Sequence, residues 1–264
     1  MKSICLILGI AGFCSALPLV AQDNYSLWPR RPRELEQARH LLSQQKWGEA
    51  VYLLQPFVAD SGVAGTEARQ IVSGINVVRY LSRMHPRSHV YIVKRGDTLP
   101  KIASQTQCPV DLLMLYNGIV SPSSLKVGQK LVYIDMTLRV EIYSPLNELT
   151  VWDEDALVVS YKILSAKGVS ARKPDAGEVK VQSREAYLQG KKVPRNSALV
   201  VGANKVIRLT DGSVISAEEN NAPVVLRLEQ KDINELALLV RESNTVLWLE
   251  QPADSRKEEK AAGK

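Results

Sequence analysis

Side chains that commonly carry out covalent or metal-dependent chemistry are few in this chain of 264 residues, and their spacing suggests no reactive group. The three histidines, His40, His85 and His89, are scattered, and isolated histidines are more often structural than metal ligands. Asp153 and Asp155 are a close carboxylate pair, but they resemble turn residues between strands and lack the cleft that glycosidase acids need. We therefore predict no metal site and no cofactor.

The formal net charge of +6 is compatible with nucleic acid, an anionic cell wall or a membrane surface. No dense stripe of lysine and arginine interleaved with aromatic residues occurs, which argues against nucleic acid as a partner. At the N-terminus, Lys2 precedes the short apolar run 4–13, and Ala16 and Ala21 are candidate cleavage positions. This pattern predicts a signal peptide over residues 1–21 and export to the periplasm or cell envelope. The alternative is a buried N-terminal helix. No later apolar run is long enough for a transmembrane segment.

Cysteine use agrees with this prediction. Cys5 and Cys14 fall within the predicted signal, so the mature chain would keep only Cys108 and could form no internal disulfide. Phe13, directly before Cys14, is too large for a lipoprotein signal. We predict that Cys108 is a buried and unreactive thiol, because nothing near it in sequence would lower its pKa.

Residues 22–86 are predicted to form a helical region. Apolar residues recur at helical spacing over 34–45 and 48–58, with a turn near Gly48, and a further helix over 66–83 could be capped by Thr66. The pattern resembles one tetratricopeptide-type hairpin, which cannot bury its apolar face without neighbours. It is either a packing domain or a surface that binds a partner.

Residues 87–135 read as a compact βααβ unit. Residues 89–93 alternate as a strand, and Asp97 or Thr98 is placed to cap the helix that follows. A second helix ends at Asn117-Gly118, and residues 127–134 form the closing strand.

This unit resembles the LysM domain. The resemblance rests on Tyr91-Ile-Val-Lys-Arg-Gly-Asp-Thr-Leu99, then Ile102-Ala103, Leu112–Leu115 with Asn117-Gly118, and Leu125-Lys-Val-Gly-Gln-Lys-Leu131. It implies binding of glycans that contain N-acetylglucosamine, such as peptidoglycan, in a shallow groove between two loops. Glycines would admit the acetamido group to the backbone, and apolar side chains such as Leu99 and Ile119 would pack on the sugar ring. The implied glycan-binding residues are Gly96, Asp97, Thr98, Leu99, Asn117, Gly118, Ile119, Val120, Leu125 and Val127. Structural roles, as helix cap, turn or core, compete at several of these positions.

Residues 136–250 change to alternating short strands with one late helix over 232–242, where Asp232 and Glu235 have the spacing of a capping box. This predicts a mostly β domain, followed by a disordered charged tail over 251–264. With the helical hairpins and the LysM unit, the fold class is α+β.

The β-rich part resembles the YkuD-type L,D-transpeptidase domain, which often accompanies LysM modules. The resemblance lies in the strands over 138–161, the turn 173–177, Val200-Val201-Gly202 and the strand 224–228. The family uses a cysteine nucleophile and a histidine, but Val225 and Val201 stand at those positions here. Residues 136–264 contain no cysteine and no histidine, so the resemblance implies a catalytically empty domain. Ser213, Ser216 and the pair 218–219 read as a surface turn and a solvated acidic patch.

The sequence thus predicts a non-enzymatic envelope protein that tethers or scaffolds peptidoglycan. An adaptor that contacts cell-wall enzymes is the alternative, and an unrecognised wall enzyme is a third. One LysM module should bind weakly, so we expect self-association or another domain to contribute.

Overall fold

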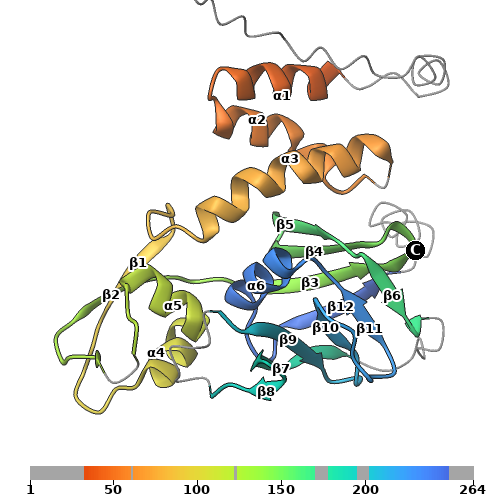
Figure 1. Ribbon diagram of the computed structural model, residues 1–264. Helices are drawn as coiled ribbons and strands as arrows, with labels where there is room; N and C mark the ends of the chain where they lie inside the picture. The colour runs from red at the N-terminus through yellow and green to blue at the C-terminus, as the bar shows by residue number, and fades with distance from the viewer. Residues whose placement is uncertain (1–32, 61, 122–123, 170–177, 195–201, 250–264) are drawn as a thin grey trace, which may run out of the picture.

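The computed structural model describes residues 33–60, 62–121, 124–169, 178–194 and 202–249 (Figure 1). The predicted signal peptide, the segment 22–32 and the charged tail lie outside these residues. Within them the parts follow in the predicted order, from helices to a βααβ unit to a mostly β region, so the α+β fold class is confirmed. No described helix combines the length and apolar character that crossing a bilayer requires.

The N-terminal part is helical. Its elements are α1 (Arg33–Ser43), α2 (Trp47–Leu54), the 3-10 helix η3 (Gln55–Phe57) and α3 (Val63–Tyr80). The turn between α1 and α2 uses Gln45, whose φ of 60° is left-handed, and Gly48 lies beside this turn in the first turn of α2. Helix α3 begins before Thr66, with Gly62 as its N-cap, and the Thr66 hydroxyl donates to the Gly62 carbonyl, so the predicted cap is wrong.

The βααβ unit comes next. It consists of β1 (Ser88–Ile92), α4 (Leu99–Thr106), α5 (Val110–Asn117) and β2 (Lys130–Ile134). The two strands pair antiparallel, with Val90 opposite Val132. One face of the strand pair carries Leu131, which is fully buried, and packs on the helices. On the other face, Val90 and Ile92 of β1 are exposed.

The C-terminal part is built on a ten-stranded sheet in the order β5-β4-β3-β12-β7-β9-β10-β11-β6, with β8 paired to β7. Its elements are β3 (Leu138–Tyr143), η5 (Ser144–Leu146), β4 (Glu148–Asp153), β5 (Ala156–Lys162), β6 (Ser165–Lys167), β7 (Val179–Leu188), β8 (Lys191–Lys192), β9 (Asn204–Leu209), β10 (Val214–Ser216), β11 (Val225–Arg227), α6 (Gln230–Leu239) and β12 (Thr245–Leu249). The two ends of this sheet, β5 and β6, are separated by only Ile163 and Leu164, so the sheet curls back on itself. Strand β12 returns parallel to β3.

Helix α6 begins at Gln230, with Glu229 as its N-cap and no side-chain cap. Asp232 and Glu235 therefore lie inside the helix, and the predicted capping box is wrong. The Glu235 carboxylate instead accepts a hydrogen bond of 2.8 Å from the Tyr161 hydroxyl of β5. The Glu235 side chain thus makes a tertiary contact with Tyr161 in place of the local capping contact that the sequence spacing predicts.

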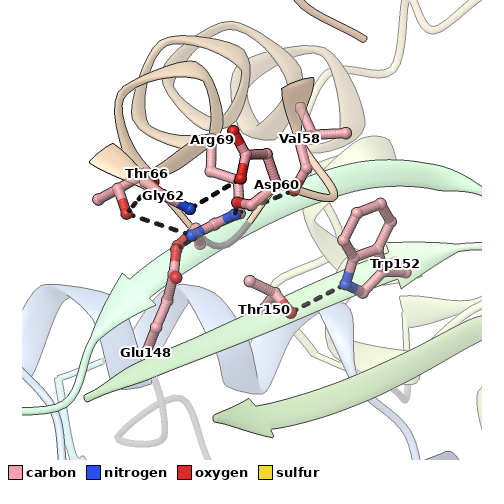
Figure 2. A network of polar contacts seen from close by, with 9 residues as sticks. Val58, Asp60, Gly62, Thr66, Arg69, Glu148, Thr150 and Trp152 are labelled. Carbon is pink, nitrogen blue, oxygen red and sulfur yellow. Dashed lines mark hydrogen bonds and ion pairs between the residues drawn. The ribbon is translucent and has the colours of Figure 1, made fainter. Parts of the chain in front are cut away.

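The helical part packs directly on the sheet. The apolar faces of α1, α2 and α3 share one cluster with two side chains of the sheet, Trp152 and Leu157. Polar contacts cross the same junction. Arg69 donates to Glu148 at 2.8 Å (Figure 2). Asn76 donates to the Leu157 carbonyl at 2.6 Å. The sheet thus supplies the neighbour that the hairpin needs to bury its apolar face.

The βααβ unit is also fixed to its neighbours. Its buried side chains belong to the same apolar cluster as those of the sheet and the end of α3. Helix α5 is held near both ends, because Asp111 pairs with Arg184 of β7 at 2.6 Å and the Tyr116 hydroxyl donates to the Tyr80 carbonyl of α3. The unit meets solvent at its two loops, at the outer face of its strands and along parts of α4 and α5, where Lys101 and Leu115 are exposed.

Candidate glycan-binding site

The two loops named by the sequence meet at the open end of the β1–β2 pair. The Val93 backbone N–H donates to the Gln129 carbonyl at 2.9 Å, and the Gly128 N–H donates to the Val93 carbonyl at 2.8 Å. The loop after β1 and the loop before β2 are thus joined by backbone hydrogen bonds. Gly96 and Gly128 have φ values of 81° and 82°, which favour glycine, so both turns depend on their glycines.

Asp97 holds the first loop together. Its carboxylate accepts hydrogen bonds of 2.8 Å from the Lys94 N–H and the Tyr91 hydroxyl, and the Lys101 ammonium lies 3.5 Å away. The hydrogen bond from the Lys94 backbone, followed by that from Tyr91, lowers the pKa of this carboxyl. Only 3% of the Asp97 side chain is exposed. The carboxylate is therefore committed to the turn.

Of the two candidate caps, Asp97 and Thr98, it is Thr98 that caps α4. It is the N-cap of α4, and its hydroxyl accepts a hydrogen bond from the Lys101 N–H at 3.4 Å. Pro100 falls in the first turn of the helix, where a missing N–H costs nothing. The Thr98 side chain remains exposed, so it can face a ligand while it caps the helix.

Leu99 and Ile119 lie in the core. Their exposed fractions are 1% and 7%, and both belong to the main apolar cluster. Both side chains therefore face the core in this structure and not the accessible surface of the loops. Leu125, half-buried, also packs against this cluster. The exposed apolar side chains of the second loop are Val120, at 76%, and Val127, at 69%.

Asn117 completes the edge of β2. Its amide donates to the Val132 and Leu113 carbonyls at 2.8 Å, and its side-chain oxygen accepts from the Val132 N–H at 2.7 Å. Gly118 follows with a φ of 60° and ends α5, as predicted. Asn117 thus positions the second loop by replacing a neighbouring strand.

Seven of the ten predicted residues divide by their side chains into a frame and an accessible surface; Gly96 and Gly118 have no side chain, and Leu125 is half-buried. The buried or engaged side chains of Asp97, Leu99, Asn117 and Ile119 form the frame, and Thr98, Val120 and Val127 are exposed. The prediction did not include four exposed cations that flank the same two loops, Lys94, Arg95, Lys126 and Lys130. The basic net charge of the chain was the available signal for them, but it does not say where the charge gathers.

The structure describes two residues of the C-terminal part on which the resemblance to transpeptidases was based, Val225 and Arg227. Val225 is buried in β11 between Val214 of β10 and Lys167 of β6. Arg227 donates to the Ala217 carbonyl at 3.2 Å. The predicted turn 173–177 and Val201 lie outside the described residues.

Two side chains in this region differ from the sequence interpretation. Ser213 lies in the turn between β9 and β10, where its carbonyl accepts a hydrogen bond from the Leu209 N–H, but it is buried at 1% exposure and does not face solvent. Asp153 is not a turn residue. It is buried at the end of β4, where it accepts hydrogen bonds of 2.9 Å from the Tyr80 hydroxyl and the Thr137 N–H, and also pairs with Arg87. Asp153 therefore joins three parts of the chain.

Glu185 of β7 is a half-buried carboxylate that accepts hydrogen bonds from three side chains. Burial alone would raise its pKa, but hydrogen bonds from Lys192, Arg208 and Tyr187 outweigh it and lower the pKa to about 2. The distances are 2.5 Å to Lys192 and 2.8 Å to each of the other two. The Glu185 carboxylate is therefore ionised near neutral pH. Together with Lys192 and Arg208 it forms a structural ion cluster, and it does not act as an acid or base.

Metal-binding and thiol chemistry find no support in the described residues. No group of three histidine, cysteine, aspartate or glutamate side chains in this part of the chain is close enough to hold a metal ion. His85 packs on Tyr80 with ring centres 4.7 Å apart, and burial lowers its pKa. Cys108 is buried as predicted, and burial raises its thiol pKa to about 12. The thiol is therefore protonated and inert at neutral pH.

The unit is a small βααβ module, with two short helices over a strand pair and with loops that meet at one open end. Residues 91–133 match the family model of the LysM domain. LysM domains generally bind glycans that contain N-acetylglucosamine, such as peptidoglycan, and they occur in cell-envelope proteins. No curated protein matches the chain.

Proposed function

We propose that this protein is an exported, non-catalytic protein of the cell envelope that holds peptidoglycan through its LysM module and so tethers or scaffolds wall material. The observation that carries the proposal is the pair of exposed valines, Val120 and Val127, on the loop that joins the open end of the module. An aliphatic surface beside backbone amides suits the ring and acetamido group of a neutral sugar. The apolar run near the N-terminus supports export.

The test is co-sedimentation of the mature chain, residues 22–264, with purified insoluble peptidoglycan. The variant Val120→Asp/Val127→Asp should stay in the supernatant where the wild type pellets, because each carboxylate would have to be desolvated under the sugar. Ile119 and Leu99 are unsuitable targets, since a change there would disturb the core. The matched control is Val63→Asp/Val78→Asp, which places two carboxylates at exposed valines of α3. Failure of the wild type to pellet, or equal loss in both variants, would refute the proposal.

We further propose that the C-terminal part is a transpeptidase-like frame without catalytic function. The support is chemical: residues 136–264 contain neither cysteine nor histidine, and Val225 fills its strand position with a buried aliphatic side chain. Incubation with muropeptides should leave them unchanged in chromatographic and mass analysis. New cross-links or released fragments that depend on the purified protein would contradict this.

An adaptor for a cell-wall enzyme is the second candidate. It is favoured by two exposed aromatic side chains on α2, Trp47 and Tyr52, since exposed aromatic residues are frequent at protein interfaces. The variant Trp47→Ala/Tyr52→Ala should leave peptidoglycan sedimentation unchanged and reduce capture of a wall synthase or hydrolase by immobilised protein. If the wild type captures such an enzyme but never pellets with peptidoglycan, the adaptor becomes the leading function.

A further inference from the structure

The open end of the LysM module carries a cluster of positive charge. Lys94 and Arg95 directly follow Val93, and Val93 is hydrogen-bonded to both Gly128 and Gln129 of the second loop. Lys126 lies at the start of this turn, where its N–H donates to the Gln129 side chain at 3.0 Å, and Lys130 stands opposite Ile92 in the strand pair. All four cations are exposed. We call Lys94, Arg95, Lys126 and Lys130 the cationic rim.

The rim is not neutralised within the described part of the chain. None of its four side chains forms an ion pair with another described residue. The carboxylate of Asp97, on the same loop, is buried in the turn and already accepts hydrogen bonds from the Lys94 backbone and the Tyr91 hydroxyl, with Lys101 beside it. Asp111 of α5 is paired with Arg184. The positive potential at the two loops is therefore available to a ligand.

Charge and apolar surface occur on the same loops. Val127 lies directly between Lys126 and Gly128, so an aliphatic side chain exposed at 69% sits within the cationic rim. A neutral sugar would use the valine and leave the cations without a role. A sugar that bears an anionic substituent would use both, because the ring can cover the apolar surface while the substituent reaches an ammonium or guanidinium group.

We propose that this LysM module selects glycan strands by their carboxylates as well as by N-acetylglucosamine, and that its ligand is peptidoglycan with carboxylate-bearing stem peptides rather than neutral chitin. This inference rests on the proposed function. It adds a charge-dependent selectivity that the acetamido sugar alone cannot give. Electrostatic complementarity of this kind speeds association and discriminates between partners, and exposed pairs lose strength as salt rises. Nucleic acid fits less well, since the exposed neighbours of the rim are aliphatic and offer no ring for base stacking.

The experiment compares three insoluble probes with the mature chain at low salt. They are peptidoglycan with free carboxylates, the same peptidoglycan after carbodiimide amidation, and chitin. We expect amidation to weaken binding about tenfold, to roughly the level of chitin, as the loss of several exposed ion pairs implies. We expect binding to untreated peptidoglycan, but not to chitin, to fall as sodium chloride rises from about 0.05 M to about 0.5 M.

A charge-matched pair of variants locates the effect. Lys94→Gln/Arg95→Gln/Lys126→Gln/Lys130→Gln removes the rim, and Arg83→Gln/Lys162→Gln/Lys167→Gln/Lys191→Gln removes four exposed cations elsewhere. Both variants lose the same net charge. Only the rim variant should lose the preference for untreated over amidated peptidoglycan, while its retained binding to chitin shows that the module is folded.

The outcomes separate the two proposals. If the wild type binds chitin and amidated peptidoglycan as well as it binds untreated peptidoglycan, the charge selectivity is refuted and the glycan-binding function stands. Equal losses in the two variants would overturn the rim by assigning the effect to net charge. Binding to none of the three probes would refute the glycan-binding function itself. Binding to anionic phospholipid vesicles that depends on the rim, without preference among the glycans, would assign the cations to a membrane surface and overturn the inference.

Discussion

The contact between Arg69 and Glu148 is predicted to hold the helical part onto the sheet. Arg69 donates to the Glu148 carboxylate at 2.8 Å and to the Asp60 and Val58 carbonyls at 2.6 and 3.1 Å (Figure 2). The Arg69→Met variant keeps most of the side-chain stem but leaves the carboxylate buried without its counter-ion. Breaking a buried pair in this way costs about 3–5 kcal/mol of folding free energy. At about 2–4 °C per kcal/mol for a chain of this size, the melting temperature should fall by about 10 °C.

Urea unfolding followed by tryptophan fluorescence measures this loss, and a double-mutant cycle identifies its cause. Glu148→Gln removes the buried charge, so Arg69→Met/Glu148→Gln should be more stable than Arg69→Met alone by about 1–3 kcal/mol. The control is Arg39→Met, which breaks the pair between Arg39 and Glu67 at the surface and should cost no more than about 1 kcal/mol. The reasoning is refuted if Arg69→Met costs no more than Arg39→Met, or if the two changes at the buried pair are simply additive.

Three further predictions concern single side chains. Because the folded pKa of Glu185 is about 2 against 4.5 for a free glutamate, its ionised form contributes up to about 3 kcal/mol of stability above pH 4.5. That contribution disappears as pH falls from 4.5 through 2, and urea unfolding from pH 7 to pH 2 should show a smaller loss in Glu185→Gln than in the wild type. Asn117→Ala should lower the unfolding free energy by about 2 kcal/mol, since it leaves backbone groups of β2 and α5 without partners, and thermal unfolding checks this. Cys108 should not react with Ellman's reagent in the native protein and should react once in urea, whereas rapid reaction in the native state would contradict its burial.

Those features of the LysM module that depend on neighbours in sequence could be predicted from the sequence. The Thr98 cap, the stop at Gly118 and the antiparallel strands follow from side-chain chemistry within a few residues, and the structure confirms them. The direction of loop side chains does not follow from local chemistry. Leu99 and Ile119 turn inward because the space between α4, α5 and the strands must be filled, and only the assembled fold determines which loop residues fill it.

Long-range polar contacts were the least predictable part. Asp153 read as a turn residue because it precedes Glu154-Asp155, yet it accepts hydrogen bonds from residues 16 and 73 positions away in sequence. Glu235 read as half of a capping box but bonds to Tyr161, which is 74 positions away. Partners this far apart in the chain cannot be identified from a single sequence. These residues also join the parts of the chain, so the predicted separate modules form one connected structure.

The cationic rim bears on how a single LysM module can hold its ligand. The weak binding expected of one module led to the expectation of self-association or a second domain, but the cationic rim supplies a second kind of contact within the same module. We therefore expect the mature chain to bind untreated peptidoglycan as a monomer. Sedimentation equilibrium should give one mass for the free protein across the concentrations used. Binding to immobilised soluble peptidoglycan fragments should follow a simple hyperbola. A sigmoidal isotherm that tracks dimer formation would show instead that two modules must act together and that the rim alone is insufficient.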